Sequence, residues 1–412
     1  MSAGSLPGTG ERVRAAWLDA PASRAVLAAL AAAGRPARFV GGCVRDALLE
    51  PGADAADLDL ATPELPERVL ALLAAAGLRS APTGLKHGTV TAFAGGRSFE
   101  ITTLRRDVAC FGRHAQVEFT DDFAADAARR DFTINTMSCD GAGRLFDPCA
   151  GRADLAAGRV RFVGAAAQRI AEDHLRILRF FRFHARFGRE PADAEALAAC
   201  AAAAESIDRL SGERIRQELF RILMTGRVLV ALDLMARTGV LARLLPWPAA
   251  PDHLARLMRH WPEADPLLRL ACLTRAHLPS RTALAGLAER LRLANAEALR
   301  LERLLTGPLP DPAAPPRARR QDLYRLGAEP YADLVRLAVA VRGADAAAAA
   351  LALHEAAAWR PPSLPVTGAD LLARGVPSGP GLGSLLAELR AAWEAADFTL
   401  DRPACLALLD RL

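Results

Sequence analysis

The stretch FVGGCVRDALLEPGADAADLDLAT, residues 39–62, decides the fold of the N-terminal part of the chain. It begins in an apolar run that predicts a buried strand, breaks at two glycines and continues as a helix from about residue 44. Gly41 and Gly42 let the backbone turn sharply, and the first amide groups of the helix point at the same place. This arrangement predicts an anion site, where Arg45 can donate to a phosphate group. Many such turns nevertheless bind nothing.

The same stretch ends in two aspartates that flank a leucine. Residues two apart on a strand project from the same face, so Asp57 and Asp59 hold their carboxylates side by side while Leu58 and Leu60 enter the core. Carboxylate oxygens are the ligands that Mg²⁺ prefers, and a pair of such ions can assist a phosphoryl or nucleotidyl transfer. The competing interpretation of this motif alone is either a solvated strand edge or a turn rich in aspartate.

Composition places the chain among soluble globular proteins. Its 412 residues, 51% of them apolar, are enough for two or more domains. No apolar run reaches the length of a membrane span, and the seven cysteines are scattered without a CxxC pair. We therefore expect a cytoplasmic protein that contacts no membrane. Arginine carries nearly all of the positive charge, but a net charge of +5 does not by itself indicate a nucleic-acid binder.

The pattern of the chain changes near residue 160. Strand-like runs occur before this point, over 38–40, 58–61, 89–93, 98–104 and 144–147. After it, helical patterns follow one another with proline-rich breaks. We expect an α+β fold, with a small mixed β-sheet and helices first and an all-helical neck, body and tail after them.

Several motifs then occur in a diagnostic order. The opening stretch is followed by GLKHGTVTA (84–92), EITTLRRD (100–107), AARRDFTINTMSCD (127–140), DPCAGRADL (147–155) and AEDHLRILRFFRFHARFG (171–188). In this order they resemble the head and neck of the class II tRNA nucleotidyltransferase and poly(A) polymerase family, and 366–389 is similar to the tail of its bacterial members. The resemblance implies a catalytic nucleotidyltransferase head (24–158), a helical neck with a nucleotide-selecting helix (159–225) and a helical, tRNA-binding body and tail (226–412).

For the catalytic centre, the resemblance implies two sets of residues: Asp57 and Asp59 as catalytic metal ligands, and Gly41, Gly42 and Arg45 as the frame of the triphosphate and metal site. Glu100 lies in SFEITTL (98–104), where the alternation of a strand places it on the face opposite Phe99 and Ile101. We expect Glu100 to be a third catalytic carboxylate beside the two aspartates.

The motif RRDFTIN matches the ribose and phosphate contacts of the family with Arg130, Asp131 and Asn135. The match is chemically sensible, because a carboxylate accepts from sugar hydroxyls while arginine and amide groups donate to phosphate oxygens. A surface charge cluster is the alternative interpretation.

The motif EDHLR (172–176) predicts selection of the nucleobase. Asp173 and Arg176 stand three apart on a predicted helix and share a face, so one can accept and the other donate along the edge of a base. The resemblance implies that this pair selects CTP or ATP without a nucleic-acid template and that Glu172 holds it in place. An intrahelical salt bridge is the alternative.

Arg179, Arg182 and Arg186 continue this helix as a basic stripe, which we interpret either as a nucleotide or RNA-backbone surface or as a solvated helix face. The resemblance adds Arg179 to the nucleotide-binding residues. In the matching neck helix over 211–219, Glu213 and Arg214 have support roles.

The resemblance carried by these motifs implies a Mg²⁺-dependent enzyme that adds CCA to tRNA 3′ ends from CTP and ATP and contacts the 3′ end and acceptor arm. The open alternatives are a poly(A) polymerase, a partial enzyme that adds only CC or only A, and a non-catalytic RNA-binding protein. The segment VACFGRHAQVEF (108–119) departs from the family, because residues 108–112 lack the usual aspartate-containing loop that flexes as the enzyme changes nucleotide. Thr136 replaces a usual alanine.

Overall fold

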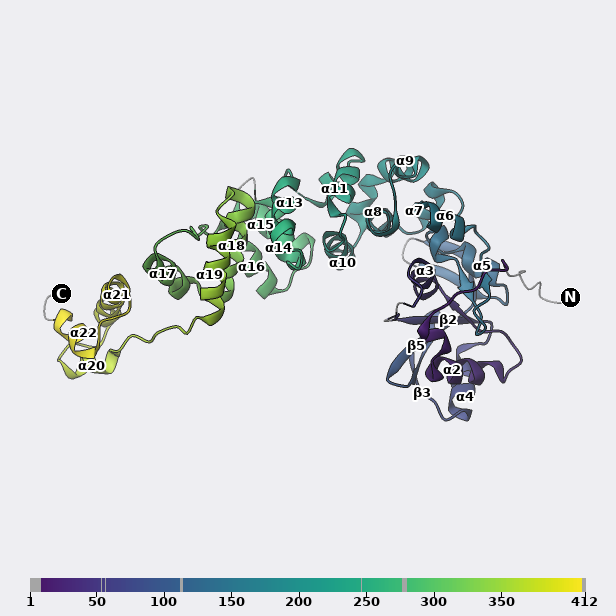
Figure 1. The fold of residues 1–412 in the computed structure, drawn as a ribbon, viewed down its shortest axis with the longest axis horizontal. Helices are drawn as coiled ribbons and strands as arrows, with labels where there is room; N and C mark the ends of the chain where they lie inside the picture. The colour runs from purple at the N-terminus through teal and green to yellow at the C-terminus, as the bar shows by residue number, and fades with distance from the viewer. Residues whose placement is uncertain are drawn as a thin grey trace. The chain divides into compact units, whose positions relative to one another are not determined.

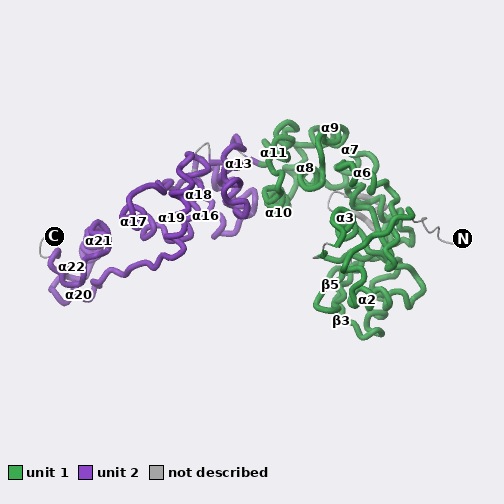
Figure 2. Tube along the Cα trace, in the orientation of Figure 1, with its two compact units in different colours: residues 1–244 green, residues 245–412 purple. Residues whose placement is uncertain are grey.

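The computed structural model describes residues 9–52, 54–55, 57–111, 114–245, 247–275 and 280–409. The chain divides into two compact units, residues 1–244 and residues 245–412 (Figures 1 and 2). The first unit contains a sheet with its covering helices and a further group of helices. The described residues of the second unit form helices and connecting segments, without strands. The α+β fold with a helical C-terminal part is confirmed, whereas the finer division into head, neck, body and tail stays a prediction.

A seven-stranded mixed sheet forms the centre of the N-terminal part of the first unit. Its strands lie in the order β3-β4-β5-β2-β1-β8-β9. Their bounds are β1 (Arg38–Val40), β2 (Leu58–Thr62), β3 (Arg79–Gly84), β4 (Thr89–Ala94), β5 (Arg97–Thr103), β8 (Ser138–Cys139) and β9 (Leu145–Phe146). The strands β2 and β5 run parallel, and the other neighbouring pairs are antiparallel.

One face of this sheet is covered by α2 (Pro21–Ala31) and α4 (Pro66–Ala75), which contact each other and the sheet. The side chains of β2 and β5 alternate accordingly. Leu58 and Leu60 are buried, as predicted, while Asp59 between them is half-buried. Glu100 on β5 is exposed between two buried apolar neighbours. The face opposite the two helices is therefore the one that presents carboxylates.

A separate hairpin follows the sheet, formed by β6 (Arg105–Phe111) and β7 (His114–Phe119). It leads into α5 (Phe123–Ala128) and the short turn η2 (Thr133–Asn135). The atypical loop over 108–112 falls partly outside the described residues, and only the backbone of 108–111 is described.

The first unit also contains a group of helices that follows the sheet along the chain. The group comprises α6 (Gly151–Ala157), α7 (Ala166–Glu172), α8 (Leu175–Phe187), α9 (Ala194–Ala202), α10 (Gly212–Leu223), α11 (Val228–Arg237) and α12 (Val240–Leu244). Helix α8 contacts α10 and α11. Phe132 packs against Phe180 and Phe183 of α8, with ring centroids 6.5 and 5.0 Å away. This aromatic contact brings the RRDFTIN motif to the surface of α8.

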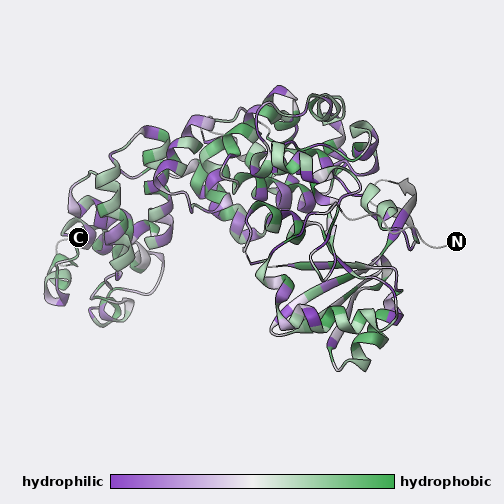
Figure 3. Ribbon diagram, turned by 45° about the vertical axis from the view of Figure 1, so that its right-hand side comes forward, coloured by the Kyte–Doolittle hydropathy of each residue, from purple (hydrophilic) through white to green (hydrophobic). Residues whose placement is uncertain are grey.

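The second unit consists of α13 (Pro251–His260), α14 (Pro266–Thr274), α15 (Arg281–Arg290), α16 (Asn295–Thr306), α17 (Pro316–Leu326), α18 (Ala328–Leu337), α19 (Ala346–Ala358), α20 (Gly368–Ala373), α21 (Pro380–Ala395) and α22 (Arg402–Leu409). Figure 3 shows hydrophobic and hydrophilic residues interspersed along the helices of the chain, as in amphipathic helices that pack around a core. Among the described residues, no helix combines the length and the apolar character needed to cross a membrane.

Candidate active site

A cavity of about 960 Å³ opens in the first unit, within the size range of small-molecule sites. Its lining is strongly charged. The arginines are Arg45, Arg105, Arg129, Arg130, Arg176, Arg179, Arg182, Arg214 and Arg221, and the acidic residues are Asp57, Asp59, Glu100, Asp126, Asp131 and Asp173. All the predicted catalytic and nucleotide-binding residues line this cavity. Of the three predicted support residues, Arg214 lines it, and Glu172 and Glu213 do not.

The acidic part of the cavity is built by two parallel strands. Asp59 and Glu100 are paired in the register of β2 and β5, and Asp57 immediately precedes β2. Burial, followed by the negative charges of Glu100 and Asp57, raises the pKa of Asp59 to about 6, although Arg130 opposes the shift. A carboxyl group whose ionised form is disfavoured by two neighbouring carboxylates suits a bound cation.

These carboxylates do not by themselves complete a metal site. In the described part of the chain, no three His, Cys, Asp or Glu side chains are grouped closely enough to hold an ion alone. Mg²⁺ is usually bound by one or two carboxylates together with substrate phosphates and water. The donor set of Asp57 and Asp59 therefore fits a divalent ion that arrives with a nucleoside triphosphate.

The glycine turn places α3 (Gly42–Leu49) beside this acidic edge. The helix begins at Gly42, two residues before the start that the sequence predicted. Gly41 has φ +73° and ψ −124°, a conformation that L side chains rarely adopt. A Cβ atom there would lie 3.0 Å from Nη1 of Arg130. Glycine at position 41 thus allows both the turn and the close approach of this arginine.

Arg45 is more enclosed than a phosphate ligand on a helix terminus would be. Its Nη1 donates to Oδ1 of Asn135 at 2.6 Å, and its Nε donates to Oδ1 of Asp46 at 2.8 Å. The guanidinium also lies 4.1 Å from the ring centroid of Phe187. Arg45 ties α3 to the RRDFTIN motif and to α8, and its contact with phosphate stays a prediction.

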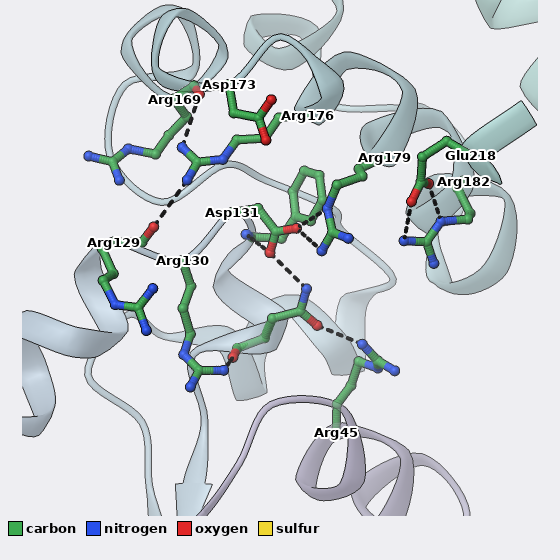
Figure 4. A network of polar contacts seen from close by, with 12 residues as sticks. Arg45, Arg129, Arg130, Asp131, Arg169, Asp173, Arg176, Arg179, Arg182 and Glu218 are labelled. Atoms are coloured by element: carbon green, nitrogen blue, oxygen red, sulfur yellow. Dashed lines mark hydrogen bonds and ion pairs between the residues drawn. The ribbon is translucent and has the colours of Figure 1, made fainter. Parts of the chain in front are cut away.

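Asp131 is the centre of a buried polar network (Figure 4). Its carboxylate accepts from Nδ2 of Asn135 and the amide of Phe132, both at 2.9 Å, and from Nε of Arg179 at 2.7 Å. Burial alone would raise the pKa of Asp131, but Arg179 and the other donors hold the pKa below its ordinary value. The network joins the RRDFTIN motif to α8 and presents an ionised carboxylate to the cavity.

The prediction that Asp173 and Arg176 share one helix was wrong. Helix α7 ends at Glu172, and Asp173 has the extended angles φ −154° and ψ 106° before α8 begins at Leu175. The Oδ1 atom of Asp173 accepts from the amide of Leu175 at 3.1 Å, so its side chain satisfies a free amide at the start of α8 instead of continuing α7. The two residues nevertheless line the same cavity.

Ion pairs hold this pair from two directions. Oε2 of Glu172 accepts from Nη1 of Arg176 at 2.6 Å, and Oδ2 of Asp173 accepts from Nη2 of Arg214 at 2.7 Å. Arg176 also donates to the carbonyl of Arg129 at 3.3 Å. These contacts support the roles expected for Glu172 and Arg214. Glu213 lies next to Arg214 in the first turn of α10.

The basic stripe of α8 is neutralised by carboxylates of the protein. Arg179 pairs with Asp131, Arg182 with Glu218 at 2.6 Å, and Arg186 with Asp46 at 3.4 Å. Glu218 and Asp126 are buried acids that sequence reasoning missed. For Asp126, the sequence offered one signal: it precedes Arg129 by three residues and Arg130 by four, the spacing of ion pairs along a helix. Glu218 lies 36 residues from its partner and gave no local signal.

Two family models match the chain. Residues 37–161 match the "Poly A polymerase head domain", and residues 193–250 match the "Probable RNA and SrmB- binding site of polymerase A". The first match contains the glycine turn, the carboxylates of β2 and β5, and the RRDFTIN motif. This head and its charged cavity define the protein as a nucleotidyltransferase.

Proteins similar to this chain show which kind of nucleotidyltransferase it resembles. The chain is 35% identical to the mitochondrial CCA tRNA nucleotidyltransferase 1 of Mus musculus over 395 residues, which cover 91% of this chain and 86% of the relative. It is 38% identical to the CCA-adding enzyme of Oceanobacillus iheyensis over 210 residues, or 50% and 51% of the two chains. The crystal structure of the Bacillus stearothermophilus CCA-adding enzyme in complex with CTP matches with a TM-score of 0.72 and 26% identity, covering 94% of this chain and 95% of that one.

The chain therefore belongs to the family of CCA tRNA nucleotidyltransferases. Enzymes of this kind generally depend on a divalent metal ion.

Proposed function

We propose that this protein adds C, C and A in turn to the 3′ end of tRNA, using CTP and ATP and releasing pyrophosphate. The observation that carries the proposal is a single cavity that joins the acidic edge of β2 and β5 to the Asp173 and Arg176 pair. The names of the relatives support it. A nucleotidyl transfer needs both parts, because one handles the phosphates and the other reads the base.

Asp57 and Asp59 would hold the divalent ion, which we infer to be Mg²⁺. When bound, the ion supplies positive charge that favours the ionised form of the attacking ribose hydroxyl and neutralises the phosphates. Glu100, paired with Asp59 across the strands, adds negative charge that strengthens the attraction for a cation.

The arginines of the cavity orient the triphosphate. Arg130 is fixed against the glycine turn, where its Nη1 donates to the carbonyl of Asn135 at 3.3 Å. Arg179 is held by Asp131. These guanidinium groups donate to phosphate oxygens, while Asp131 and Asn135 lie where sugar hydroxyls and phosphates would meet the protein. Such fixed donors reduce the entropy lost when substrate and primer are aligned.

Asp173 and Arg176 select the base. Cytosine and adenine both carry an exocyclic amino group that can donate a hydrogen bond to a carboxylate. Uracil has a carbonyl at that position and cannot donate. Arg176 donates to an acceptor nitrogen or oxygen on the same edge of the base. Because Glu172 and Arg214 hold the two side chains, the pair can act as a fixed template of protein donors and acceptors.

We infer further that the head spans 24–158 and the neck spans 159–225. The helical body and tail over 226–412 would bind the tRNA, with the 3′ end and acceptor arm directed to the cavity. The family match over 193–250, whose description includes RNA binding, supports RNA contacts from the neck onward. We place the protein in the cytoplasm, because a reducing compartment fits its scattered cysteines.

The test uses purified protein, Mg²⁺ and three tRNA transcripts that end before CCA, after C and after CC. Each transcript receives CTP, ATP or both, and the products are resolved on a sequencing gel. We expect C, C and A to be added, followed by arrest. Long A tails would instead indicate a poly(A) polymerase, and a stop at CC or activity on the CC transcript alone would indicate a partial enzyme.

A catalytically disabled control separates catalysis from binding. The double variant Asp57→Ala, Asp59→Ala removes both proposed metal ligands from the acidic edge. We expect it to bind tRNA and to add no nucleotide. If the native protein also adds nothing while it binds tRNA, the chain is an RNA-binding protein and the proposal fails.

A further inference from the structure

Asp126 occupies an unusual place in the cavity wall. It lies on α5, is only 3% exposed and yet lines the cavity. Its Oδ1 pairs with Nη2 of Arg129 at 2.8 Å, and its Oδ2 pairs with Nη2 of Arg130 at 3.4 Å. The amide of Arg105, the first residue of the β6–β7 hairpin, also donates to Oδ1 at 3.3 Å. One buried carboxylate therefore contacts two arginines of the cavity and the base of the hairpin.

The charges explain why a carboxylate is needed there. Arg129 and Arg130 are adjacent in sequence, and both guanidinium groups reach the same cavity. Two neighbouring cations repel each other, and the repulsion is stronger in a partly buried site than in water. A negative charge that pairs with both of them offsets this repulsion and restricts their rotamers. Without it, the two side chains would separate.

The contacts also fix where Arg130 points. It is held by Asp126 through Nη2, by the carbonyl of Asn135 through Nη1, and by the narrow space beside Gly41. Asp126 itself cannot be a phosphate ligand, because an ionised carboxylate has no hydrogen to donate and repels the anion. Its effect on a nucleotide must therefore pass through the arginines.

We propose that Asp126 is a positioning residue that holds Arg129 and Arg130 together as a donor pair for the phosphates of the incoming nucleotide. This inference rests on the proposed function in one respect, namely that the cavity binds a nucleoside triphosphate. It assigns no role in reading the base, so CTP, ATP and a phosphate chain without a base should all be affected alike.

The experiment measures binding of CTP, ATP and inorganic tripolyphosphate, with Mg²⁺ present, to the full-length protein and its variants. Asp126→Asn keeps the shape of the side chain and removes its charge. We expect it to weaken all three ligands by a similar factor of about ten- to hundredfold, the loss of one or two well-placed charged hydrogen bonds. Asp126→Glu restores the carboxylate and should recover part of the affinity.

Asp154→Asn is the matched control. Asp154 is also fully buried and also pairs with two arginines, Arg159 at 3.0 Å and Arg161 at 2.8 Å, but it is not among the residues that line the cavity. We expect this variant to lower the melting temperature and to leave tripolyphosphate affinity unchanged. An equal loss of affinity in both variants would show a general structural effect and overturn the proposal.

A double-mutant cycle tests whether Asp126 acts through the arginines. In the background Arg129→Gln, Arg130→Gln, which should itself bind tripolyphosphate weakly, Asp126→Asn should cause no further loss. The proposal is overturned if the losses are additive, or if either Asp126→Asn or the double arginine variant binds tripolyphosphate as the native protein does. The result for the double arginine variant remains decisive if Asp126→Asn does not fold. A native protein that binds CTP but adds nothing to tRNA would instead refute the proposed function and leave this measurement intact.

Discussion

Gly41 shows how a single residue shapes the cavity wall beside Arg130. At φ +73° and ψ −124°, replacement by alanine strains the backbone, and the new Cβ atom would lie 3.0 Å from Arg130. We expect Gly41→Ala to lower the free energy of unfolding by about 1–3 kcal/mol. We also expect it to reduce kcat/KM for CTP by about one to two orders of magnitude, because Arg130 is displaced. Chemical denaturation and initial-rate kinetics measure the two effects.

The neighbouring glycine provides the control. Gly42 is already helical, and a Cβ atom there would meet only the flexible end of Arg45, at 3.7 Å. Gly42→Ala should therefore leave the free energy of unfolding equal to or above that of the native protein. Equal destabilisation by the two substitutions would contradict the explanation from backbone conformation.

Asp131 permits a prediction about pH. Its pKa in the folded chain lies below the ordinary value of 3.8, so its contribution to stability is fully present above that value and is lost as the pH falls through the lower folded pKa. Asp131→Asn leaves Arg179 without its buried partner and should cost about 3 kcal/mol at neutral pH. The difference from the native protein should stay constant down to about pH 5 and narrow below about pH 4. Urea unfolding across this range measures it, and a difference independent of pH would exclude the carboxylate as its source.

At the residue scale, the motifs identified most of the side chains that meet in the cavity but not the partners that hold them. Arg45 could be placed beside the glycine turn from the sequence, yet it is enclosed by Asn135, 90 residues away, and by Phe187 at the end of α8. Glu218 reaches Arg182 across two packed helices. Local spacing carries no information about such contacts, because they exist only once the helices are packed.

At the scale of elements, the strands that the sequence indicated are present as β1, β2, β4, β5 and β9. Strand β3 was not predicted, because it lies at the edge of the sheet, contains proline and has no buried residue to reveal an alternation. The break between α7 and α8 was also missed, since a helical periodicity continues through EDHLR. The break depends on Asp173, whose side chain accepts a hydrogen bond from the backbone amide of Leu175. Such a bond competes with the helix, and the periodicity of apolar residues does not reveal it.

This break gives Arg214 of α10 a part in the proposed selection of the base. Asp173 is not fixed by a helix, so Arg214 at 2.7 Å is a main restraint on its side chain. We expect Arg214→Ala to lower the preference for CTP over UTP by about tenfold while the protein stays folded. Misincorporation on the transcript that ends before CCA measures this preference.

Arg237→Ala is the matched control for this change. It removes another arginine ion pair, with Asp233 at 2.9 Å on α11, between two largely exposed side chains outside the cavity lining. We expect no change in the preference for CTP, because surface ion pairs contribute little. If both variants lose selectivity equally, Arg214 has no special role in holding Asp173.

At the scale of the whole molecule, each unit is held together by its own contacts. In the second unit, Arg300 joins Asp265 at 2.6 Å to Asp333 at 2.9 Å, and buried Arg275 donates to the carbonyls of Leu304 and Gly307 at the end of α16. Cations at the C-terminal end of a helix are favourable. Among the residues that the structure describes, those that line the cavity all belong to the first unit.

This separation predicts that residues 1–244 fold alone and keep the nucleotide site. We expect the truncated protein to unfold cooperatively and to bind CTP within about threefold of the full-length protein, because every residue of the cavity lining is retained. Its affinity for tRNA should fall by more than about tenfold, since the proposed contacts of the body and tail are lost. Calorimetry measures the unfolding of the fragment and its affinity for CTP, and filter binding measures its affinity for tRNA, all at one fixed salt concentration. Loss of CTP binding in a folded fragment would mean that the second unit contributes to the nucleotide site, and unchanged tRNA affinity would place the RNA contacts in the first unit.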